Sequence, residues 1–334
     1  MSTQQYDTLT DQQVLALAST LLERYDNSYQ GDISLLCRSE NATLKITTTN
    51  NRYALRIHRP DYHSFNAINS ELLWLDALRE NGIEVPIAIA NKEGERVQTL
   101  TLDSGEQRYA VMFGWIEGDM PTTEVDPKAF FGLGAITAKL HQHAKSWQRP
   151  ASFERIIWNH QTMVTDDAHW GRWQDAPHLN PSDHALIHQA LTKVAQQMAA
   201  YGMSDDRYGL IHADLRLTNI LLFNGQTRVI DFDDCGMGWY MHDLAAAISF
   251  NEHLANAPLW VDQWLNGYET QAHCSDSDLA ILPAMIIQRR IQMLAWTGTH
   301  AQTEMTLSLG DQWANESVRL CRRYLETDGL PIGQ

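Results

Sequence analysis

The chain has 334 residues, and its 41 Asp and Glu against 25 Lys and Arg give a formal net charge of −16. At about 150 residues per domain, this length favours two domains or lobes. The 44% of hydrophobic residues is typical of a globular protein, so a collagen, a coiled coil and a disulfide scaffold are excluded. The acidic balance also argues against nucleic acid as a partner, because nucleic-acid-binding proteins need basic residues along their binding surface.

The cysteines and the first residues bear on the cellular compartment. Residues 1–10 are polar and lack the basic and apolar regions of a secretory signal. No apolar run approaches the roughly 18 residues that span a bilayer. We therefore expect a cytoplasmic protein with no membrane partner, whose oligomeric state the sequence leaves open. The four cysteines form no CxxC pair, as expected of reduced thiols: Cys37, Cys235, Cys274 and Cys321.

The first 114 residues are predicted to be rich in strands. Apolar residues at helical spacing predict helices over 11–25, with Thr10 as N-cap, and over 68–81. The glycine-containing segment 114–118 ends this region, so we expect lobes over 1–114 and 115–334. Alternating apolar and polar residues predict two antiparallel strand pairs, 42–47 with 53–58 and 97–102 with 108–113.

Residues 115–334 are predicted to be mainly helical. We expect Ser182 to cap a helix and Gly202 to end it. Residues 208–234 are expected to form three strands joined by a loop and a turn. The Trp-rich segment 145–181 supports no assignment and is either a lid or a structural insertion. The helical segments are 130–143, 182–201 and much of 238–330.

One stretch of the chain has a pattern suited to phosphoryl transfer. It contains His212, Asp214 and Asn219 in the spacing H-x-D-x-x-x-x-N, and an apolar strand that ends at Asp231 follows it. Phosphoryl transfer depends on positioning and charge neutralisation. It needs a carboxylate that accepts the proton of the attacking hydroxyl, oxygen ligands for Mg²⁺, and a cation beside the transferred group.

Four residues of this stretch meet those needs. Asp214 is the candidate catalytic base, and Arg216, two residues later, is the candidate catalytic cation. Asn219 can return to the same point after a loop turn. Asp231 follows a strand that can run antiparallel beside residues 220–222. We therefore expect Asn219 and Asp231 to ligate Mg²⁺.

With both parts of the pattern in place, the chain resembles the family of aminoglycoside phosphotransferases and choline kinases. The similarity is to its bacterial homoserine kinase-like and stress-response Ser/Thr kinase-like branch. His212, Asp214 and Asn219 match one family signature, and residues 230–233, Ile-Asp-Phe-Asp, match another. The resemblance implies ATP, Mg²⁺ and an α+β, bilobal protein-kinase-like fold. The small strand-rich N-lobe would bind the nucleotide, and the larger, mainly helical C-lobe would hold the catalytic residues and the acceptor.

The same resemblance assigns residues of the N-lobe to the nucleotide phosphates. Arg56 stands where the family usually has a lysine that holds the α and β phosphates, and Glu71 in the following helix would pair with it. Arginine keeps the charge but binds phosphate with a different geometry. Lys45, on the partner strand, is a rival for this role, and the two remain alternatives.

Two further segments of the N-lobe match the family. Residues 111–118 resemble the connection between the lobes, so we expect the backbone at Met112, Phe113 and Trp115 to bind adenine. Residues 39–43 take the place of the phosphate-binding loop, although they lack the full glycine pattern of that loop.

Some residues near these patterns have supporting roles in the family. His212 is expected to support the catalytic loop rather than act as the base, and Asp243 matches an aspartate that buttresses the same loop. Asp234 either adds charge near the metal or caps a turn. Three residues fall where family members build the acceptor site, with a core or surface role as the alternative: Trp239, Trp296 and His300.

The leading hypothesis is an ATP- and Mg²⁺-dependent kinase that phosphorylates a hydroxyl of a small molecule. Amino alcohols, homoserine-like amino acids, sugars and aminoglycosides remain open as acceptors, as does GTP in place of ATP. A Ser/Thr protein kinase of the same fold is the second hypothesis. A nucleotide-binding regulatory protein without turnover is the third, and the presence of Asp214, Asn219 and Asp231 argues against it.

Overall fold

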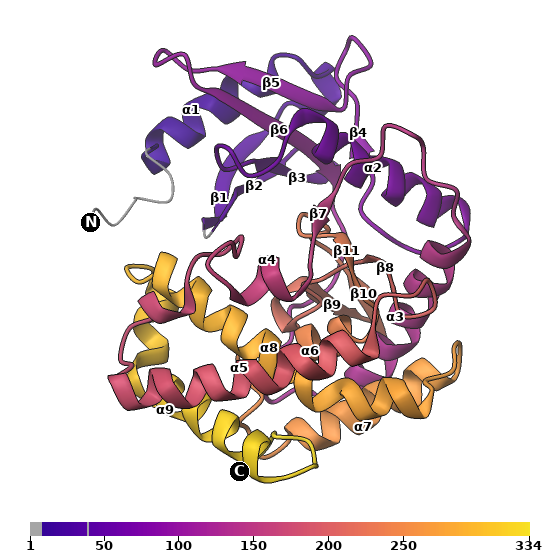
Figure 1. Cartoon of the computed structure of the whole chain (residues 1–334). Coiled ribbons are helices and arrows are strands. Elements are labelled where there is room, and N and C mark those ends of the chain that lie inside the picture. The colour runs from indigo at the N-terminus through magenta and orange to yellow at the C-terminus, as the bar shows by residue number, and fades with distance from the viewer. Residues whose placement is uncertain (1–8, 39) are drawn as a thin grey trace. The chain divides into compact units, whose positions relative to one another are not determined.

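The computed structural model describes residues 9–38 and 40–334. Ser39, the first residue of the expected phosphate-binding loop, lies outside the described residues, as do the first eight residues of the polar N-terminus. The chain divides into two compact units, which are drawn in Figure 1. The first comprises Met1–Glu117 and Arg149–Arg155, and the second comprises Gly118–Gln148 and Ile156–Gln334.

The first unit is built on a six-stranded sheet in which all neighbouring strands are antiparallel. The order is β1-β2-β3-β6-β4, and β5 also pairs with β6. Both strand pairs predicted from the alternating pattern are confirmed, because β2 pairs with β3 and β5 pairs with β6. The strands are β1 (Asp32–Arg38), β2 (Ala42–Thr47), β3 (Arg52–Ile57), β4 (Ala88–Ile89), β5 (Val97–Thr101) and β6 (Gln107–Gly114).

Helix α1, Asp11–Leu22, packs its apolar face against this sheet. The predicted N-cap is confirmed: the Thr10 hydroxyl accepts a hydrogen bond from the Gln13 backbone N–H, and the Gln13 side-chain oxygen accepts one from the Thr10 backbone N–H. Each Val, Leu or Ile side chain fully buried under the helix stabilises the unit by about 1.5–3 kcal/mol. This core includes Val14, Ala18, Leu21, Leu44, Ile46 and Leu55.

Helix α2, Phe65–Glu80, confirms the second helix predicted in this unit. Its N-cap is Ser64, whose hydroxyl accepts from the Ala67 backbone. Gly82 follows its end with a φ of 76°, in the left-handed region that favours glycine. The segment Arg149–Arg155 belongs to this unit because Arg155 donates to the Ala67 carbonyl over 2.9 Å.

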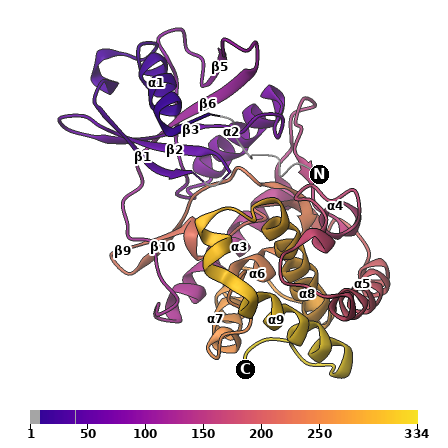
Figure 2. The ribbon, with the colours of Figure 1, turned by 90° about the vertical axis from the view of Figure 1, so that its left-hand side faces the viewer.

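The second unit contains two small sheets, both formed around residues 208–239. β9 and β10 make an antiparallel hairpin, which lies at one side of the unit in Figure 2. β11 pairs antiparallel with β8 and parallel with β7. The three strands predicted over 208–234, joined by a loop and a turn, are confirmed as β8, β9 and β10, and β11 follows them at Gly236. The strands are β7 (Ile156–Ile157), β8 (Tyr208–Ile211), β9 (Ile220–Phe223), β10 (Gln226–Val229) and β11 (Gly236–Trp239).

Helices form most of the second unit. α3 and α7 pack closely, and two glycines permit the contact. A Cβ on Gly134 of α3 would lie 1.9 Å from the Trp264 carbonyl oxygen, and one on Gly267 of α7 would lie 1.9 Å from the Phe131 carbonyl oxygen. The helices are α3 (Lys128–Ser146), α4 (His160–Val164), α5 (Pro181–Tyr201), α6 (His242–Ala247), α7 (Ala257–Glu269), α8 (Asp276–Thr299) and α9 (Glu304–Glu326).

The start of α5 differs from the prediction. Its N-cap is Asn180, whose side chain accepts hydrogen bonds from the backbone of Ser182 and Asp183, so the expectation of Ser182 as the cap is wrong. Pro181 explains the difference, since proline suits the first helical position and leaves the cap to the residue before it. The predicted end at Gly202 is confirmed by its φ of 78°.

Most of the segment 145–181, which the sequence left unassigned, is part of the core of the second unit, although Arg149–Arg155 belongs to the first. It contains β7, α4 and a short 3₁₀ turn over Trp173–Asp175. Trp158, Trp170 and Trp173 are all buried, and both α4 and the 3₁₀ turn pack against α8.

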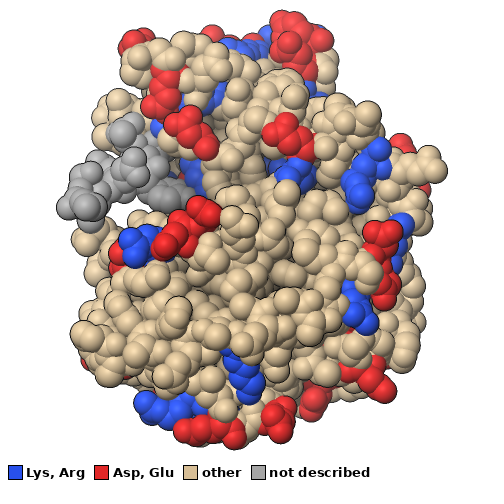
Figure 3. Space-filling view, in the orientation of Figure 1, with Lys and Arg blue, Asp and Glu red and all other residues tan. Residues whose placement is uncertain are grey.

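Charge and hydropathy agree with the composition. Lys and Arg are scattered among Asp and Glu on the face drawn in Figure 3. Among the helices of residues 9–38 and 40–334, none combines the length and the apolar character that crossing a bilayer requires.

Candidate active site

The loop that follows β8 is held by a buried aspartate from the start of α6. Asp243 accepts hydrogen bonds from the backbone N–H groups of His212, over 3.2 Å, and Ala213, over 2.7 Å. Ala213 has a φ of 69°, an uncommon value for alanine. Two hydrogen bonds to one carboxylate therefore fix a strained turn directly before Asp214.

Asp243 is itself oriented by a second layer of side chains. The Nε2 of His141 lies 2.9 Å from the Asp243 carboxylate, and the Nδ1 of the same ring lies 2.9 Å from the Tyr268 hydroxyl. Burial lowers the pKa of His141 more than Asp243 raises it, so the ring is neutral. A neutral ring can donate from Nε2 to Asp243 and accept at Nδ1 from Tyr268.

His212 supports the loop, as expected from the sequence. Its Nε2 lies 3.0 Å from the carbonyl oxygen of Ile230. Its Nδ1 lies 3.3 Å from the backbone N–H of Asp214. A ring that donates at one nitrogen and accepts at the other links the catalytic loop to the residue directly before Asp231.

Asp214 lies at the centre of the loop, and its side chain is almost completely buried. Its carboxylate accepts from Asn219 Nδ2 over 2.7 Å, from Arg216 Nε over 3.1 Å and from Arg289 Nη2 over 2.5 Å. Burial alone would raise the pKa of Asp214, but Arg216 and then Arg289 lower it by more. The pKa lies below its ordinary value, so Asp214 is a carboxylate that can accept a proton.

Asn219 and Asp231 lie close together, as the sequence predicts. β9 and β10 pair antiparallel, and the Ile230 N–H donates to the Asn219 carbonyl over 2.9 Å. Asp231 follows with a φ of 60°. The NH₂ group of Asn219 is bonded to Asp214, which leaves the amide oxygen as the atom that Asn219 can offer to a metal. One amide oxygen and one carboxylate suit a hard cation such as Mg²⁺.

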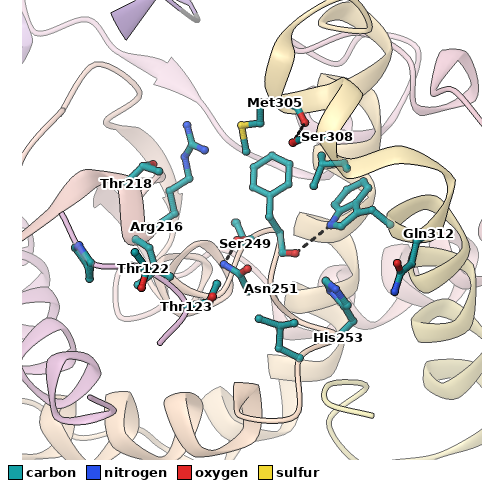
Figure 4. A pocket seen from close by; sticks show the side chains of 16 residues that line it. Thr122, Thr123, Arg216, Thr218, Ser249, Asn251, His253, Met305, Ser308 and Gln312 are labelled. Carbon is teal, nitrogen blue, oxygen red and sulfur yellow. Dashed lines mark hydrogen bonds between the residues drawn. The ribbon is translucent and has the colours of Figure 1, made fainter. Parts of the chain in front are cut away.

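A cavity of about 590 Å³ opens beside the catalytic loop, within the second unit. Its wall is formed by Arg216 and Ser249 and by residues of α9 that include Met305, Ser308 and Gln312, as Figure 4 shows. The size is within the ordinary range for small-molecule sites. The sequence reasoning missed the contribution of α9, because the residues that form this wall carry no recognisable pattern.

The wall of this cavity combines apolar and uncharged polar side chains and carries little charge. Among the described residues that line it, Arg216 is the cation and no Asp or Glu occurs. Burial, followed by the nearby Arg290, lowers the pKa of His253 to about 4, so this residue is neutral near pH 7. Threonine, serine, asparagine and glutamine side chains supply most of the remaining polar groups.

The first unit brings together the two residues expected to bind the nucleotide phosphates. Arg56 Nη2 lies 2.6 Å from the Glu71 carboxylate, and both side chains are buried. The Arg56 guanidinium also lies 5.1 Å from the centre of the Phe113 ring. Lys45, the alternative, lies on the neighbouring strand β2. The expected ion pair is present, and its role toward a nucleotide stays a prediction.

The residues expected at the adenine differ in their backbone environment. Met112 and Phe113 belong to β6 and are paired with β3 on one side and β4 on the other. Trp115 comes directly after the end of β6, and its ring lies 5.3 Å from the Arg52 guanidinium. Of the three, Trp115 is the residue whose backbone lies outside the sheet.

Other residues singled out from the sequence are in the core of the second unit. The Trp239 indole donates to the Gly202 carbonyl over 2.8 Å. The Trp296 ring stacks on His300 with 4.2 Å between centroids. All three side chains predicted near the acceptor are buried: Trp239, Trp296 and His300.

Arg289, which contacts Asp214 in the catalytic loop, was not predicted from the sequence. It lies in α8, 75 positions from Asp214. A signal for it exists in the sequence, because Arg289 and Arg290 are the charged residues of the segment 281–294, which is otherwise apolar apart from two glutamines. Such residues are almost never fully buried unless they are paired, which marks this pair as unusual.

The comparisons with known proteins point in one direction. A model described as "Phosphotransferase enzyme family" matches residues 38–279. The solved structure of a microcompartment-associated aminopropanol kinase is 39% identical, with 95% of this chain and 99% of that chain covered and a TM-score of 0.88. This likeness confirms the α+β fold expected from the sequence.

More distant relatives cover most or much of the chain. Amicoumacin kinase of Bacillus subtilis (strain 168) is 23% identical over 96% of this chain and 94% of that protein. The solved structure of an amicoumacin kinase with AMP-PNP and Ca²⁺ is 22% identical, covers 95% of this chain and 94% of that chain, and has a TM-score of 0.75. Homoserine kinase of Neisseria meningitidis serogroup B is 27% identical, with 73% of this chain and 74% of that protein covered.

Proposed function

The chain belongs to the phosphotransferase enzyme family and is a kinase with a hydroxyl group as acceptor, and on that premise we propose that it transfers the γ-phosphoryl group of ATP to a small amino alcohol. The observation that carries this proposal is the Asp214 carboxylate. It is buried, charged and held by three side chains, next to a cavity that shares Arg216 with it. A base of this kind is what the attack of an alcohol on phosphorus requires.

In the proposed reaction, the acceptor hydroxyl donates its hydrogen bond to the Asp214 carboxylate. As the oxygen–phosphorus bond forms, the proton passes to Asp214 and the bond from the γ phosphorus to the β–γ bridging oxygen breaks, releasing ADP. Arg216 offsets charge on the transferred group. Asn219 and Asp231 would hold a Mg²⁺ ion, which neutralises phosphate charge when it is bound.

Residues of the first unit would bind the nucleotide. Arg56 is proposed to contact the phosphates, with Glu71 orienting its guanidinium through the buried ion pair. The backbone near Trp115 is proposed to contact the adenine. Residues 1–114 would then serve as the nucleotide lobe, and residues 115–334 as the catalytic and acceptor lobe.

An amino alcohol is the first acceptor to test because of the aminopropanol kinase relative, which covers 95% of this chain. The cavity supports a second candidate, an acceptor that also carries a carboxylate. Among the described residues that line the cavity, Arg216 carries a positive charge and none is Asp or Glu. The wall therefore has an attractive charge for an anion and has no carboxylate that could bind an ammonium group. A homoserine-like acceptor has that chemistry.

Matched pairs of acceptors separate the two candidates. Threonine is 1-amino-2-propanol with one added carboxylate, and homoserine is 3-amino-1-propanol with the same addition. We would measure ADP release and phosphorylated product for each compound with ATP and Mg²⁺, and without Mg²⁺ as a control. Faster turnover of the two amines supports the amino alcohol, and faster turnover of the two amino acids supports the carboxylate-bearing class.

Asp214→Asn is the catalytic control, because it keeps the shape of the side chain and removes its basicity. We expect transfer to fall by at least about 10²-fold, with nucleotide affinity nearly unchanged. Near-normal turnover in this variant would remove Asp214 from the proposed role. A protein substrate in the same panel tests the protein-kinase alternative, and the absence of turnover with every acceptor would favour the regulatory one.

A further inference from the structure

Arg289 is a fully buried cation whose three donor nitrogens each reach a different side chain. Its side chain is 1% exposed. Nε donates to the Ser249 hydroxyl over 2.8 Å, Nη1 to Gln292 Oε1 over 3.1 Å, and Nη2 to Asp214 Oδ1 over 2.5 Å. Its guanidinium lies 5.0 Å from the centre of the Trp170 ring. Burying a guanidinium costs free energy unless its donors are paired in good geometry. The three hydrogen bonds and the Trp170 ring hold the Arg289 guanidinium in one position.

The two oxygens of the Asp214 carboxylate differ in how many donors they accept. Oδ2 accepts from Asn219 Nδ2 and from Arg216 Nε. Oδ1 accepts one hydrogen bond from the described part of the chain, and its donor is Arg289 Nη2. A carboxylate oxygen accommodates about two donors. Oδ1 therefore has room for one more, while Oδ2 is already satisfied.

We propose that Arg289 is a positioning residue that turns Oδ1 of Asp214 toward the hydroxyl of the acceptor. This inference rests on the proposed role of Asp214 as the base. Arg289 also binds Ser249, which lines the cavity. One rigid guanidinium thus connects the base with the wall against which the acceptor is held, and the acceptor hydroxyl approaches Oδ1.

Arg290 offers a matched control within the same helix. It is also fully buried and also pairs with a carboxylate, that of Glu252. Its Nε donates to the Ser317 hydroxyl over 2.7 Å and its Nη2 to the Trp313 carbonyl over 3.0 Å. Replacing Arg290 therefore breaks a buried ion pair of similar kind without removing a contact to Asp214.

The test compares Arg289→Gln and Arg289→Lys with Arg290→Gln and Arg290→Lys. Each variant is assayed for its melting temperature, its ATP affinity, and the kcat and KM of transfer per folded molecule. We expect Arg289→Gln to lower kcat by about tenfold or more, with the KM for ATP unchanged within about twofold. Arg289→Lys should recover part of this loss, because an ammonium group can still reach Asp214 but cannot also hold Ser249.

The Arg290 variants should lose comparable thermal stability while their kcat per folded molecule stays closer to that of the wild type. Equal kcat losses at the two positions would overturn the inference. If Arg289→Gln does not fold, Gln292→Met replaces it, since this change removes the Nη1 contact and keeps the ion pair. A kcat for Gln292→Met equal to that of the wild type, together with full activity of Arg289→Lys, would also overturn it.

The proposed function can fail separately from this inference. Full activity of Asp214→Asn would remove the base and with it the reason for positioning Oδ1. A strong loss in Asp214→Asn, combined with matching results for the Arg289 and Arg290 variants, would keep the base and reject only the positioning role.

Discussion

Two guanidinium groups act on one carboxylate at the catalytic loop, and this determines its charge. Without Arg216 and Arg289, burial would raise the pKa of Asp214 and favour its neutral form. A neutral carboxyl group cannot accept the proton of an alcohol. The same arginines place two positive charges against one negative charge, which suits the approach of phosphate groups in the proposed reaction.

Variants of Arg56 test the proposal that this residue contacts the phosphates of the nucleotide. We expect Arg56→Gln to raise the KM for ATP and to leave the KM for the acceptor unchanged, because the proposed contact is with the phosphates. Arg56→Lys should have a smaller effect, since it keeps the charge next to Glu71 but loses the planar fork of the guanidinium. Steady-state kinetics with ATP varied at saturating acceptor measures both.

Lys45→Ala is the control for this prediction. Lys45 is half-buried on β2 and was the rival for the same role. If Lys45→Ala raises the KM for ATP and the Arg56 variants leave it unchanged, the phosphate contact belongs to β2. Breaking the buried pair also leaves Glu71 without its cation, so the melting temperature of each Arg56 variant must be measured beside its kinetics.

At the scale of elements, local sequence patterns predicted the helices, strands and caps that depend on residues close together in the chain. The antiparallel pairing of β9 and β10, which holds Asp231 near Asn219, followed from two short apolar segments on either side of a turn. Helix α1 and its cap followed from spacing and from one threonine. The N-cap of α5 is Asn180 and not the predicted Ser182, because Pro181 takes the first helical position and leaves the cap to the residue before it.

Contacts between elements that are distant in the chain could not be predicted from the sequence. Arg289 reaches Asp214 across 75 positions, and its charge within an apolar helix signals a buried partner without naming it. The cavity combines Arg216 from the catalytic loop with Met305 and Ser308 from α9. Nothing in the local pattern of either segment predicts that they meet, since their packing depends on the helices between them.

Helix α9 is kinked at Gly310, next to the residues that line the cavity. Gly310 has a φ of 60° and a ψ of −162° inside the helix, a conformation that costs other residues about 1–3 kcal/mol. A Cβ there would meet nothing within 4 Å, so the cost of Gly310→Ala falls on the backbone alone. The kink separates Met305 and Ser308 from Gln312, and all three line the cavity.

We therefore expect Gly310→Ala to raise the KM for the acceptor while the KM for ATP stays unchanged. Gly105→Ala is the control, because Gly105 also has a positive φ of 83° and open space around its Cα, but lies in a turn of the first unit. Both variants should lose some stability. An acceptor KM that changes equally in both, or in neither, would show that the kink does not shape the cavity.

At the scale of the whole molecule, buried histidines make the folded chain sensitive to acid. Burial, followed by Arg289, lowers the pKa of His242 to about 3, and burial, followed by Arg290, lowers that of His253 to about 4. The ordinary value is 6.5, so between about pH 6.5 and pH 4 the unfolded chain binds protons that the folded chain does not. Acidification through this range therefore favours unfolding.

The lowered pKa values of Asp214 and Asp243 act in the same direction at more acid pH, below the ordinary aspartate value of 3.8. We expect the urea midpoint of unfolding to fall steadily as the pH is lowered from 6.5 to 4.5. His253→Gln should flatten this dependence, because it removes one of the histidines whose pKa is lowered in the folded chain and which the unfolded chain therefore protonates first. A midpoint independent of pH over this range, or one equally steep in His253→Gln, would contradict the assignment of His253 as a neutral residue in the folded chain.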